Sequence, residues 1–187
     1  MLKKDLRSLY KNRRHALDEK SITDFSLSIA NGLLKLPVWS YDYYHIFLPI
    51  SENKEVDTTF ILSILQGKDK NVVLPKVADY NTLQHFLLTD STRIRKNKWN
   101  IPEPIDGIEV PIGKIDVVFM PLLGFDKKGN RVGYGKGFYD AFLGECRNDI
   151  IKIGLSMFKV EEELITDTHS NDVPLDYCVT PNKTYSF

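Results

Sequence analysis

The order of the elements is decided by residues 115–140, IDVVFMPLLGFDKKGNRVGYGKGFYD, in which a strand, a glycine-rich loop and a helix follow one another. Ile115–Met120 gives the strongest β-strand signal in the chain, because the run is mostly apolar and a proline follows it. Five of the chain's 11 glycines come within the 14 residues from 124 to 137, and a helix is predicted to begin near Gly137. This order predicts a loop at the carboxyl end of a sheet, where α/β proteins bind ligands.

The glycine-rich loop has the composition of an anion-binding site. Glycines adopt positive φ angles and let a ligand approach the backbone, so successive N–H groups can surround a phosphate. Arg131 and Lys136 add the cations that suit a polyphosphate. The spacing matches neither a Walker A loop nor the dinucleotide fingerprint, so it predicts only a phosphate-binding loop. The sequence also predicts a hairpin over Asp126–Asn130, and the alternative to a functional loop is a simple turn.

Outward from this loop, short apolar strands alternate with amphipathic helices. Helices are predicted over about residues 2–18, from a capping box at Ser21–Asp24 to Pro37, and from Asp57 to Gly67. Further strands are predicted at Tyr43–Leu48, Val72–Leu74, Leu83–Thr89, Ile150–Leu155 and Leu175–Val179, with a long connection over residues 96–114. The alternation predicts an α/β fold with a mostly parallel central sheet.

Composition limits the class of protein. The 187 residues, 42% of them hydrophobic, predict a single domain over residues 1–187. The formal net charge is zero, from 25 basic and 25 acidic residues, which argues against a nucleic-acid or membrane-surface binder. The sequence has neither a secretory signal nor an apolar run of about 18 residues, and its two cysteines, Cys146 and Cys178, fit reduced thiols. A cytoplasmic protein is therefore expected.

The residues of the loop also carry a family resemblance. Gly124-Phe125-Asp126 and the run Gly129–Asp140 resemble the signature of 5-formyltetrahydrofolate cyclo-ligases, with Phe138 where the family usually has a tyrosine. The resemblance extends nearly end to end through Lys3–Arg14, Glu55–Thr58, Trp99–Pro104 and Asp172–Asp176, although residues 51–54 form a longer loop than in some relatives. It implies a Rossmann-like three-layer α/β sandwich.

The resemblance also implies a reaction. ATP and 5-formyltetrahydrofolate would become 5,10-methenyltetrahydrofolate, ADP and phosphate, with Mg²⁺ as the metal. Phosphoryl transfer of this kind depends on positioning and charge neutralisation, so no protein nucleophile is required. A serine or cysteine triad is accordingly not expected. The implied partner is the folate substrate, and a monomer is expected.

Roles for single residues follow from the resemblance. Arg131 and Lys136 would stabilise the transferring phosphoryl group. The ATP site would comprise Lys3, Lys4, Arg7, Arg131, Val132, Gly133, Tyr134, Gly135, Lys136, Gly137, Phe138 and Tyr139. The folate site would comprise Glu55, Tyr134, Gly135, Lys136, Gly137 and Phe138, and the Mg²⁺ site Asp140 and Asp172. The alternative interpretations are ordinary ones: a solvated basic helix face for the N-terminal cations, and capping or turn acids for the carboxylates.

Some residues receive no role from the sequence. Trp99 and Phe125 are interpreted as core aromatics in preference to ligand-stacking ones. The four histidines show no ligand spacing, and His45 and His85 are predicted to be packed within strands. Two other classes of function stay open: a sugar-phosphate isomerase or acyl-CoA transferase on a similar scaffold, and a non-catalytic nucleotide or folate sensor.

Overall fold

The computed structural model describes residues 1–79 and 82–187. Its central sheet has seven strands in the order β11-β10-β9-β6-β1-β2-β3. Neighbouring strands from β10 to β2 run parallel, whereas β11 and β3 join the two edges antiparallel. The strands are β1 (Tyr43–His45), β2 (Asn71–Val77), β3 (Leu83–Leu87), β6 (Val117–Pro121), β9 (Ile151–Leu155), β10 (Tyr177–Val179) and β11 (Thr184–Ser186). The predicted α/β fold with a mostly parallel sheet is confirmed.

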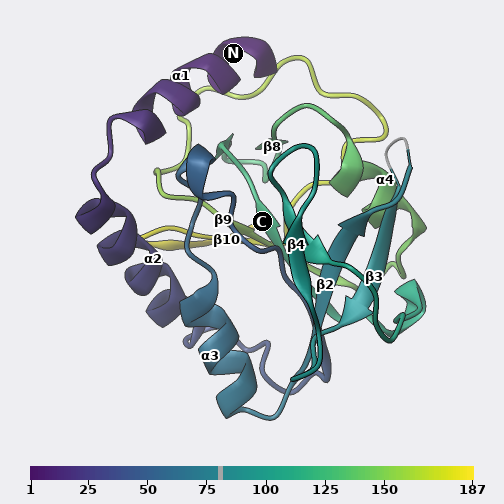
Figure 1. The fold of residues 1–187 in the computed structure, drawn as a ribbon. Helices are drawn as coiled ribbons and strands as arrows, with labels where there is room; N and C mark the ends of the chain where they lie inside the picture. Colours follow the sequence, from purple (N-terminus) through teal and green to yellow (C-terminus); the bar gives the residue numbers. More distant parts are fainter. Residues whose placement is uncertain (80–81) are drawn as a thin grey trace.

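Helices cover both faces of this sheet (Figure 1). On one face lie α2 (Glu19–Leu33) and α3 (Thr59–Gly67), and on the other lies α4 (Phe138–Glu145). The N-terminal helix α1 (Lys3–His15) packs instead against a small hairpin, β7 (Gly124–Phe125) and β8 (Arg131–Val132). A second hairpin pairs β4 (Ile94–Lys96) with β5 (Pro102–Pro104), and two short 3₁₀ turns lie at Ser51–Asn53 and Ile112–Lys114.

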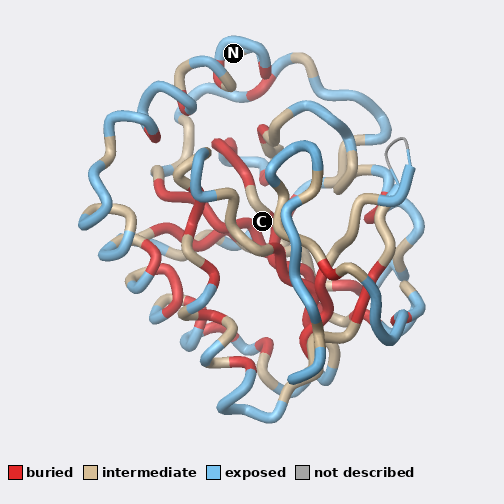
Figure 2. The backbone as a smooth tube through the Cα atoms, in the orientation of Figure 1, coloured by how far each residue is buried: buried red, intermediate tan, exposed pale blue. Residues whose placement is uncertain are grey.

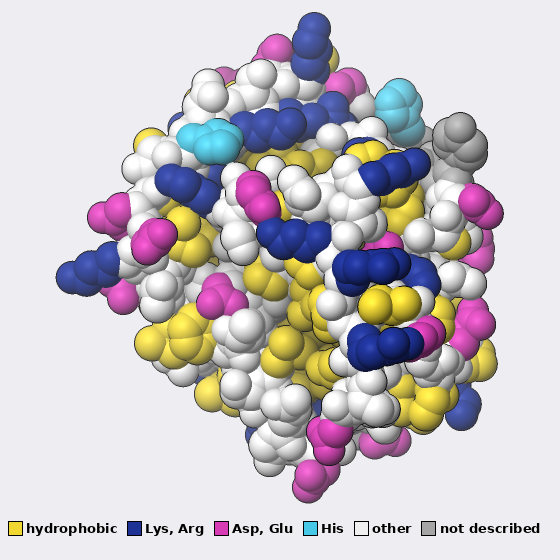
Figure 3. Space-filling view, in the orientation of Figure 1, with side chains coloured by type: hydrophobic (Ala, Val, Ile, Leu, Met, Phe, Trp, Pro, Cys, Tyr) yellow, Lys and Arg dark blue, Asp and Glu magenta, His cyan; other side chains and the backbone are white. Residues whose placement is uncertain are grey.

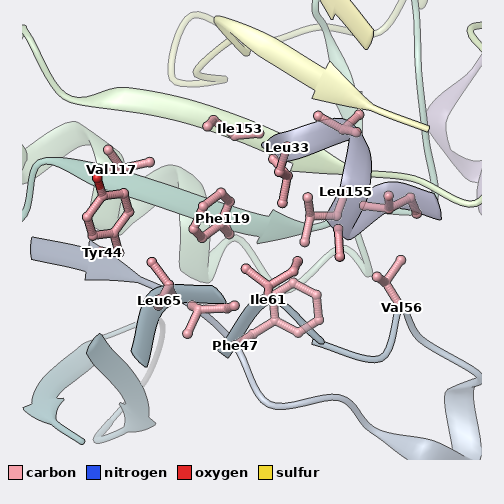
Figure 4. Packing of buried hydrophobic residues seen from close by; sticks show 14 of the residues in the cluster. Leu33, Tyr44, Phe47, Val56, Ile61, Leu65, Val117, Phe119, Ile153 and Leu155 are labelled. Carbon is pink, nitrogen blue, oxygen red and sulfur yellow. The ribbon is translucent and has the colours of Figure 1, made fainter. Parts of the chain in front are cut away.

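Strand β6 supplies the core on both faces of the sheet, because successive side chains of a strand point to opposite sides. Val117 and Phe119 face α2 and α3, where Phe119 stacks on Tyr44 with 6.2 Å between ring centroids (Figure 4). Val118 and Met120 face α4. These four side chains of β6 are fully buried, and Figure 2 shows the buried residues concentrated along the central strands.

The predicted hairpin over Asp126–Asn130 is confirmed. The Asp126 carboxylate is fully buried and accepts backbone N–H hydrogen bonds from Lys128 at 2.9 Å, from Asn130 at 3.1 Å and from Ile165 at 2.9 Å. A carboxylate with several N–H donors fixes a tight turn. The hairpin therefore leads the chain from β6 to the glycines in a defined conformation.

Some predicted element boundaries were wrong. Helix α2 begins three residues earlier than expected, because the Asp18 carboxylate accepts from the Ser21 N–H at 2.7 Å and so caps the helix. Strand β2 does not end at Pro75 but runs on to Val77. Pro75 is paired with His85 of β3, but the pairing of β1 with β2 ends at Val73, so on that side no strand pairs with the proline.

The other differences between the predicted and the observed elements concern the length and the number of the strands. Strand β1 ends at His45, three residues before the predicted end, and part of the predicted connection over residues 96–114 forms the β4–β5 hairpin. Edge strand β11 was not predicted. No helix within residues 1–79 and 82–187 is long and apolar enough to cross a membrane.

Candidate active site

A cavity of about 510 Å³ lies at the carboxyl ends of β6, β1 and β2. Pro121 at the end of β6, Phe47 just beyond β1 and Val77 at the end of β2 contribute to its walls. The glycine-rich loop and α1 close the opposite side. Figure 3 shows hydrophobic side chains in a hollow of the surface with lysine and arginine side chains gathered around it. The cavity thus lies where the sequence predicted a ligand site.

The glycine-rich loop lies against α1 by close backbone contact. Gly135 has φ +92° and Gly137 φ +74°, conformations that residues with a Cβ rarely adopt. A Cβ on Gly135 would lie 3.2 Å from the Arg7 guanidinium carbon, and Arg7 Nε donates to the Gly133 carbonyl at 3.0 Å. Glycine is therefore required at position 135 both for the backbone conformation and for the approach of Arg7.

Arg131 points into the cavity as a buried cation with 7% of its side chain exposed. Its Nη2 donates to Asp140 Oδ1 at 2.7 Å, and its Nε donates to the Val173 carbonyl at 3.4 Å. Burial lowers the pKa of Arg131, and the Asp140 charge opposes that shift. Arg131 thus contributes a fixed positive charge beside the loop backbone.

A second ion pair lies at the same end of the cavity. Lys3 Nζ donates to Asp172 Oδ2, and the Lys3 backbone N–H donates to Asp167 Oδ1 at 2.8 Å. The pKa of Asp172 is lowered: burial raises it, but the hydrogen bonds from Lys3 and from the His169 N–H outweigh that effect. This end of the cavity therefore combines cations, backbone amides and ionised carboxylates.

The other end is mostly apolar and contains one buried carboxylate. Glu55 is 5% exposed, and its Oε2 accepts from the Ile50 N–H at 2.8 Å. Burial raises the pKa of Glu55, and the Ile50 amide, the Tyr134 hydroxyl and the Arg14 charge partly offset the rise. The surrounding apolar residues are Phe47, Leu48, Ile50, Pro75, Val77, Leu83, Trp99 and Ile101. A flat polar heterocycle could lie on this surface and donate to Glu55.

Two aspartates at the cationic end of the cavity, Asp140 and Asp172, are candidates for holding a metal ion. No group of three or more His, Cys, Asp or Glu side chains suited to a metal ion occurs within the described ranges of the chain. Asp140 Oδ2 and Asp172 Oδ1 have no hydrogen-bond partner among those same residues, because both carboxylates use their other oxygen. Mg²⁺ commonly takes one or two carboxylates and completes its shell with phosphates and water. The two aspartates fit such a site and not a complete protein cage.

Most of the residues predicted for the site line this cavity. They are Lys3, Arg7, Glu55, Arg131, Gly133, Tyr134, Gly135, Lys136, Gly137, Phe138, Tyr139, Asp140 and Asp172. Lys4 is exposed and Val132 is buried beside Leu6 and Tyr10, so neither lies on the cavity wall. Their predicted contact with ATP stays a prediction.

Phe125 and Trp99, the two aromatic residues interpreted as core residues, differ in their burial. Phe125 is fully buried against Tyr185 and Phe187, as the core interpretation predicted. That interpretation was wrong for Trp99, which is 42% exposed, lines the cavity and lies 4.4 Å from the Lys136 ammonium. The side chain of Asn97 fixes the turn that carries Trp99, by accepting from the Trp99 N–H at 2.9 Å. His45 and His85 are buried, as predicted.

Sequence reasoning did not assign Asp167 or Arg14 to the site. Asp167 lines the cavity, and Arg14 lies behind it with its Nη1 donating to the Tyr134 hydroxyl at 2.5 Å. The only signal for Arg14 is its place on the buried face of α1, four residues after Tyr10. For Asp167 the sequence contains no signal, because its position depends on the path of residues 158–174 back to α1.

Comparison with known proteins supports one family. The model of the 5-formyltetrahydrofolate cyclo-ligase family matches residues 2–181. A 5-formyltetrahydrofolate cyclo-ligase of Haemophilus influenzae is 35% identical over 138 residues, which cover 70% of this chain and 72% of the relative. A mouse (Mus musculus) protein of the same description is 33% identical over 156 residues, which cover 77% of this chain and 74% of that protein.

A solved structure agrees with the fold. The NMR structure of the Aquifex aeolicus 5,10-methenyltetrahydrofolate synthetase aligns with a TM-score of 0.84 and 29% identity, over all of this chain and 93% of that one. The predicted family and the predicted Rossmann-like architecture are confirmed. The chain belongs to the 5-formyltetrahydrofolate cyclo-ligase family, and with it to the ATP-dependent ligases of folate one-carbon metabolism.

Proposed function

We propose that the chain uses ATP and Mg²⁺ to convert 5-formyltetrahydrofolate into 5,10-methenyltetrahydrofolate, with release of ADP and phosphate. The observation that carries the proposal is a single cavity whose two ends differ in chemistry. One end has cations and glycine amides, and the other has apolar walls around the buried Glu55 carboxylate. A phosphate donor and a pterin can therefore meet in one space.

ATP is needed because a formamide oxygen is a poor leaving group. In the proposed reaction the formyl oxygen attacks the γ-phosphorus and the bond to ADP breaks. N10 of the folate then attacks the formyl carbon, the oxygen departs with the phosphate, and the N10 proton is lost. Both steps develop negative charge on phosphate oxygens, so fixed cations and amide donors accelerate them.

The phosphate end would act through residues that the fold holds in place. Arg131 is buried and paired, so little reorganisation is needed when charge develops nearby. Arg7 lies against the Gly133–Gly135 backbone, and Lys136 is on the same loop. We assign Arg131 and Lys136 to the transferring phosphoryl group, and Lys3 and Arg7 to the phosphates of ATP.

Mg²⁺ would bind through Asp140 and Asp172. Their unpaired oxygens at the cationic end of the cavity support this assignment. When bound beside phosphates, Mg²⁺ neutralises part of their charge. At the other end Glu55 would bind the pterin, because an ionised carboxylate matches the paired N–H donors of an aminopyrimidine ring.

We further propose that the chain acts as one domain and as a monomer. Two core clusters lie on opposite faces of one continuous sheet, which supports a single cooperative unit. Size-exclusion chromatography with light scattering tests the monomer. A cytoplasmic location stays a prediction.

An assay of ADP release with and without 5-formyltetrahydrofolate tests the proposed function against the alternatives. The cyclo-ligase releases ADP only when the folate is present. A sugar-phosphate isomerase or an acyl-CoA transferase releases none in response to a folate, and a sensor binds without turnover. The family match favours the first outcome.

A further inference from the structure

The β4–β5 hairpin forms one wall of the apolar end of the cavity. Trp99 and Ile101, in the turn between its two strands, line the cavity. Strand β5 is joined to the central sheet, because Glu103 Oε2 accepts from the Val77 N–H at the end of β2 at 3.0 Å. Strand β4 is the outer strand of the hairpin, and its three residues are exposed (Figure 1). The side of the hairpin away from β5 therefore needs a separate attachment.

One ion pair supplies that attachment. Lys96, the last residue of β4, donates to Glu52 Oε1 at 2.7 Å, and both side chains are half exposed. Within residues 1–79 and 82–187, no other hydrogen bond or ion pair joins residues 94–101 to a part of the chain outside the hairpin. The position of the cavity-lining turn thus depends on this pair more than on any other polar contact.

Glu52 lies in a 3₁₀ turn that is itself held in place. Lys54 follows this turn, and its Nζ donates to the His15 carbonyl at the end of α1 at 2.8 Å and to the Leu17 carbonyl. Asn53, between Glu52 and Lys54, lines the cavity. The turn is therefore fixed to the end of α1, and Glu52 is a fixed point to which the hairpin attaches.

We propose that Glu52 and Lys96 are positioning residues, whose ion pair holds the β4–β5 hairpin so that Trp99 and Ile101 form a wall against the folate. The inference rests on the proposed binding of the folate at this end of the cavity. Neither Glu52 nor Lys96 lines the cavity, so both act through the residues beside them. An exposed ion pair contributes little to overall stability, but a small free energy is enough to select the position of a hairpin with no other polar attachment on that side.

A competing interpretation is that Lys96 binds an anionic group of the folate directly and that Glu52 only competes for it. The two interpretations predict opposite signs for Glu52→Gln. Loss of the pair loosens the hairpin and raises the KM for the folate, whereas release of Lys96 for an anion lowers that KM. A pair without any effect, as many exposed ion pairs are, leaves the KM unchanged.

Steady-state kinetics of Glu52→Gln, of Lys96→Gln and of the double variant test the proposal. Each single change should raise the KM for 5-formyltetrahydrofolate about two- to fivefold, with kcat and the KM for ATP changed less than about 1.5-fold. The double variant should be no worse than either single one, because both changes remove the same contact. The exchange of charges, Glu52→Lys with Lys96→Glu, should bring the KM for the folate back to within about 1.5-fold of the unmodified chain.

Asp106→Asn is the matched control. Asp106 pairs with Arg93 just outside the hairpin strands, both side chains are exposed, and neither residue lines the cavity. This variant loses an exposed ion pair of the same kind without loosening the attachment of the hairpin to the turn of Glu52. Its KM for the folate should equal that of the unmodified chain.

Acrylamide quenching of Trp99 fluorescence gives a measurement that needs no turnover. The chain has two tryptophans, so Trp39→Phe leaves Trp99 as the only one. In that background Glu52→Gln should raise the quenching constant of the free protein, and the exchange of charges should restore it. Asp106→Asn should leave it unchanged.

The inference is overturned if Glu52→Gln lowers the KM for the folate or leaves it unchanged, if the exchange of charges fails to restore it, or if Trp99 quenching does not respond. Absence of turnover in the unmodified chain would instead overturn the proposed function, and the quenching data would still show whether the ion pair positions the hairpin. The two failures are therefore distinguishable.

Discussion

Arg131 and Asp140 form an ion pair with 2.7 Å between Nη2 and Oδ1, and this pair joins the end of the β7–β8 hairpin to the first turn of α4. The two residues bracket the glycine-rich loop, so their pairing fixes the distance between its ends. We proposed Arg131 for the phosphoryl group and Asp140 for Mg²⁺. One ion pair would then serve both the geometry of the loop and the charge of the site.

Arg131→Ala should lower kcat at least about tenfold while the fold survives. Removing one group that stabilises developing charge typically costs roughly 3 kcal/mol in the transition state. Arg147→Ala is the control, because Arg147 pairs with Asp116 on an exposed surface outside the cavity. Near-normal turnover of a folded Arg131→Ala protein would remove Arg131 from the active site.

Glu55→Gln should weaken folate binding much more than ATP binding. The amide keeps the shape of the side chain but replaces one acceptor oxygen with a donor, which faces the donors of the pterin. Separate titrations of 5-formyltetrahydrofolate and of ATP measure the two affinities. Equal losses would contradict the assignment of Glu55 to the pterin.

The same substitution should stabilise the free protein at neutral pH. Burial raises the pKa of Glu55, so the folded chain binds a proton more tightly than the unfolded one. The stability that protonated Glu55 contributes is therefore lost as pH rises through its folded pKa. Glu55→Gln should raise the melting temperature at pH 7.5, and by less at pH 4. A lower melting temperature at pH 7.5 would contradict this prediction.

Gly135→Ala should reduce kcat/KM for ATP. The alanine must adopt φ +92°, which costs roughly 1–2 kcal/mol, and its Cβ displaces the Arg7 guanidinium. Gly144→Ala in α4 is the matched control, because a Cβ there meets no atom within 4 Å. That control should raise stability slightly and leave kcat/KM unchanged. Equal kinetics of the two variants would argue against close packing of Arg7 on the loop.

The buried pair of His45 and His85 should make the protein sensitive to acid. Their rings lie 5.2 Å apart, and burial lowers both pKa values, that of His85 to about 4. The unfolded chain binds these protons near pH 6.5, so stability falls as pH drops from about 6.5 toward 4, by up to about 1.4 kcal/mol per pH unit for each histidine.

Urea unfolding at pH 7.5 and at pH 5 measures this loss. His85→Leu should reduce the difference between the two pH values, and His15→Gln, at an exposed position, should leave it unchanged. An undiminished loss in His85→Leu would assign the acid sensitivity to other groups.

The sequence predicted the fold and the place of the site because both follow from local patterns. The apolar run before Pro121 fixed β6, and the glycines after it marked the loop. Element ends were less predictable, since Asp18 and Ser21 are both good capping residues and only packing selects between them. Pro75 was misjudged because its effect depends on whether strands pair with it on both sides.

The residues that sequence analysis missed depend on contacts between distant parts of the chain. Asp167 reaches the Lys3 N–H, 164 positions away, and Arg14 reaches Tyr134, 120 positions away. No local pattern encodes such distances. The ion pairs of Arg131 with Asp140 and of Lys3 with Asp172 were also not foreseen, although each residue was predicted for the site.

The most direct test of the central claim is to mix the purified protein with 5-formyltetrahydrofolate, Mg²⁺ and ATP at mildly acidic pH, where the methenyl product persists, and to follow its near-ultraviolet absorbance. We expect a rise that requires both ATP and the folate. No rise from a protein shown to be folded would contradict it and would leave the glycine-rich loop as a phosphate site without this reaction.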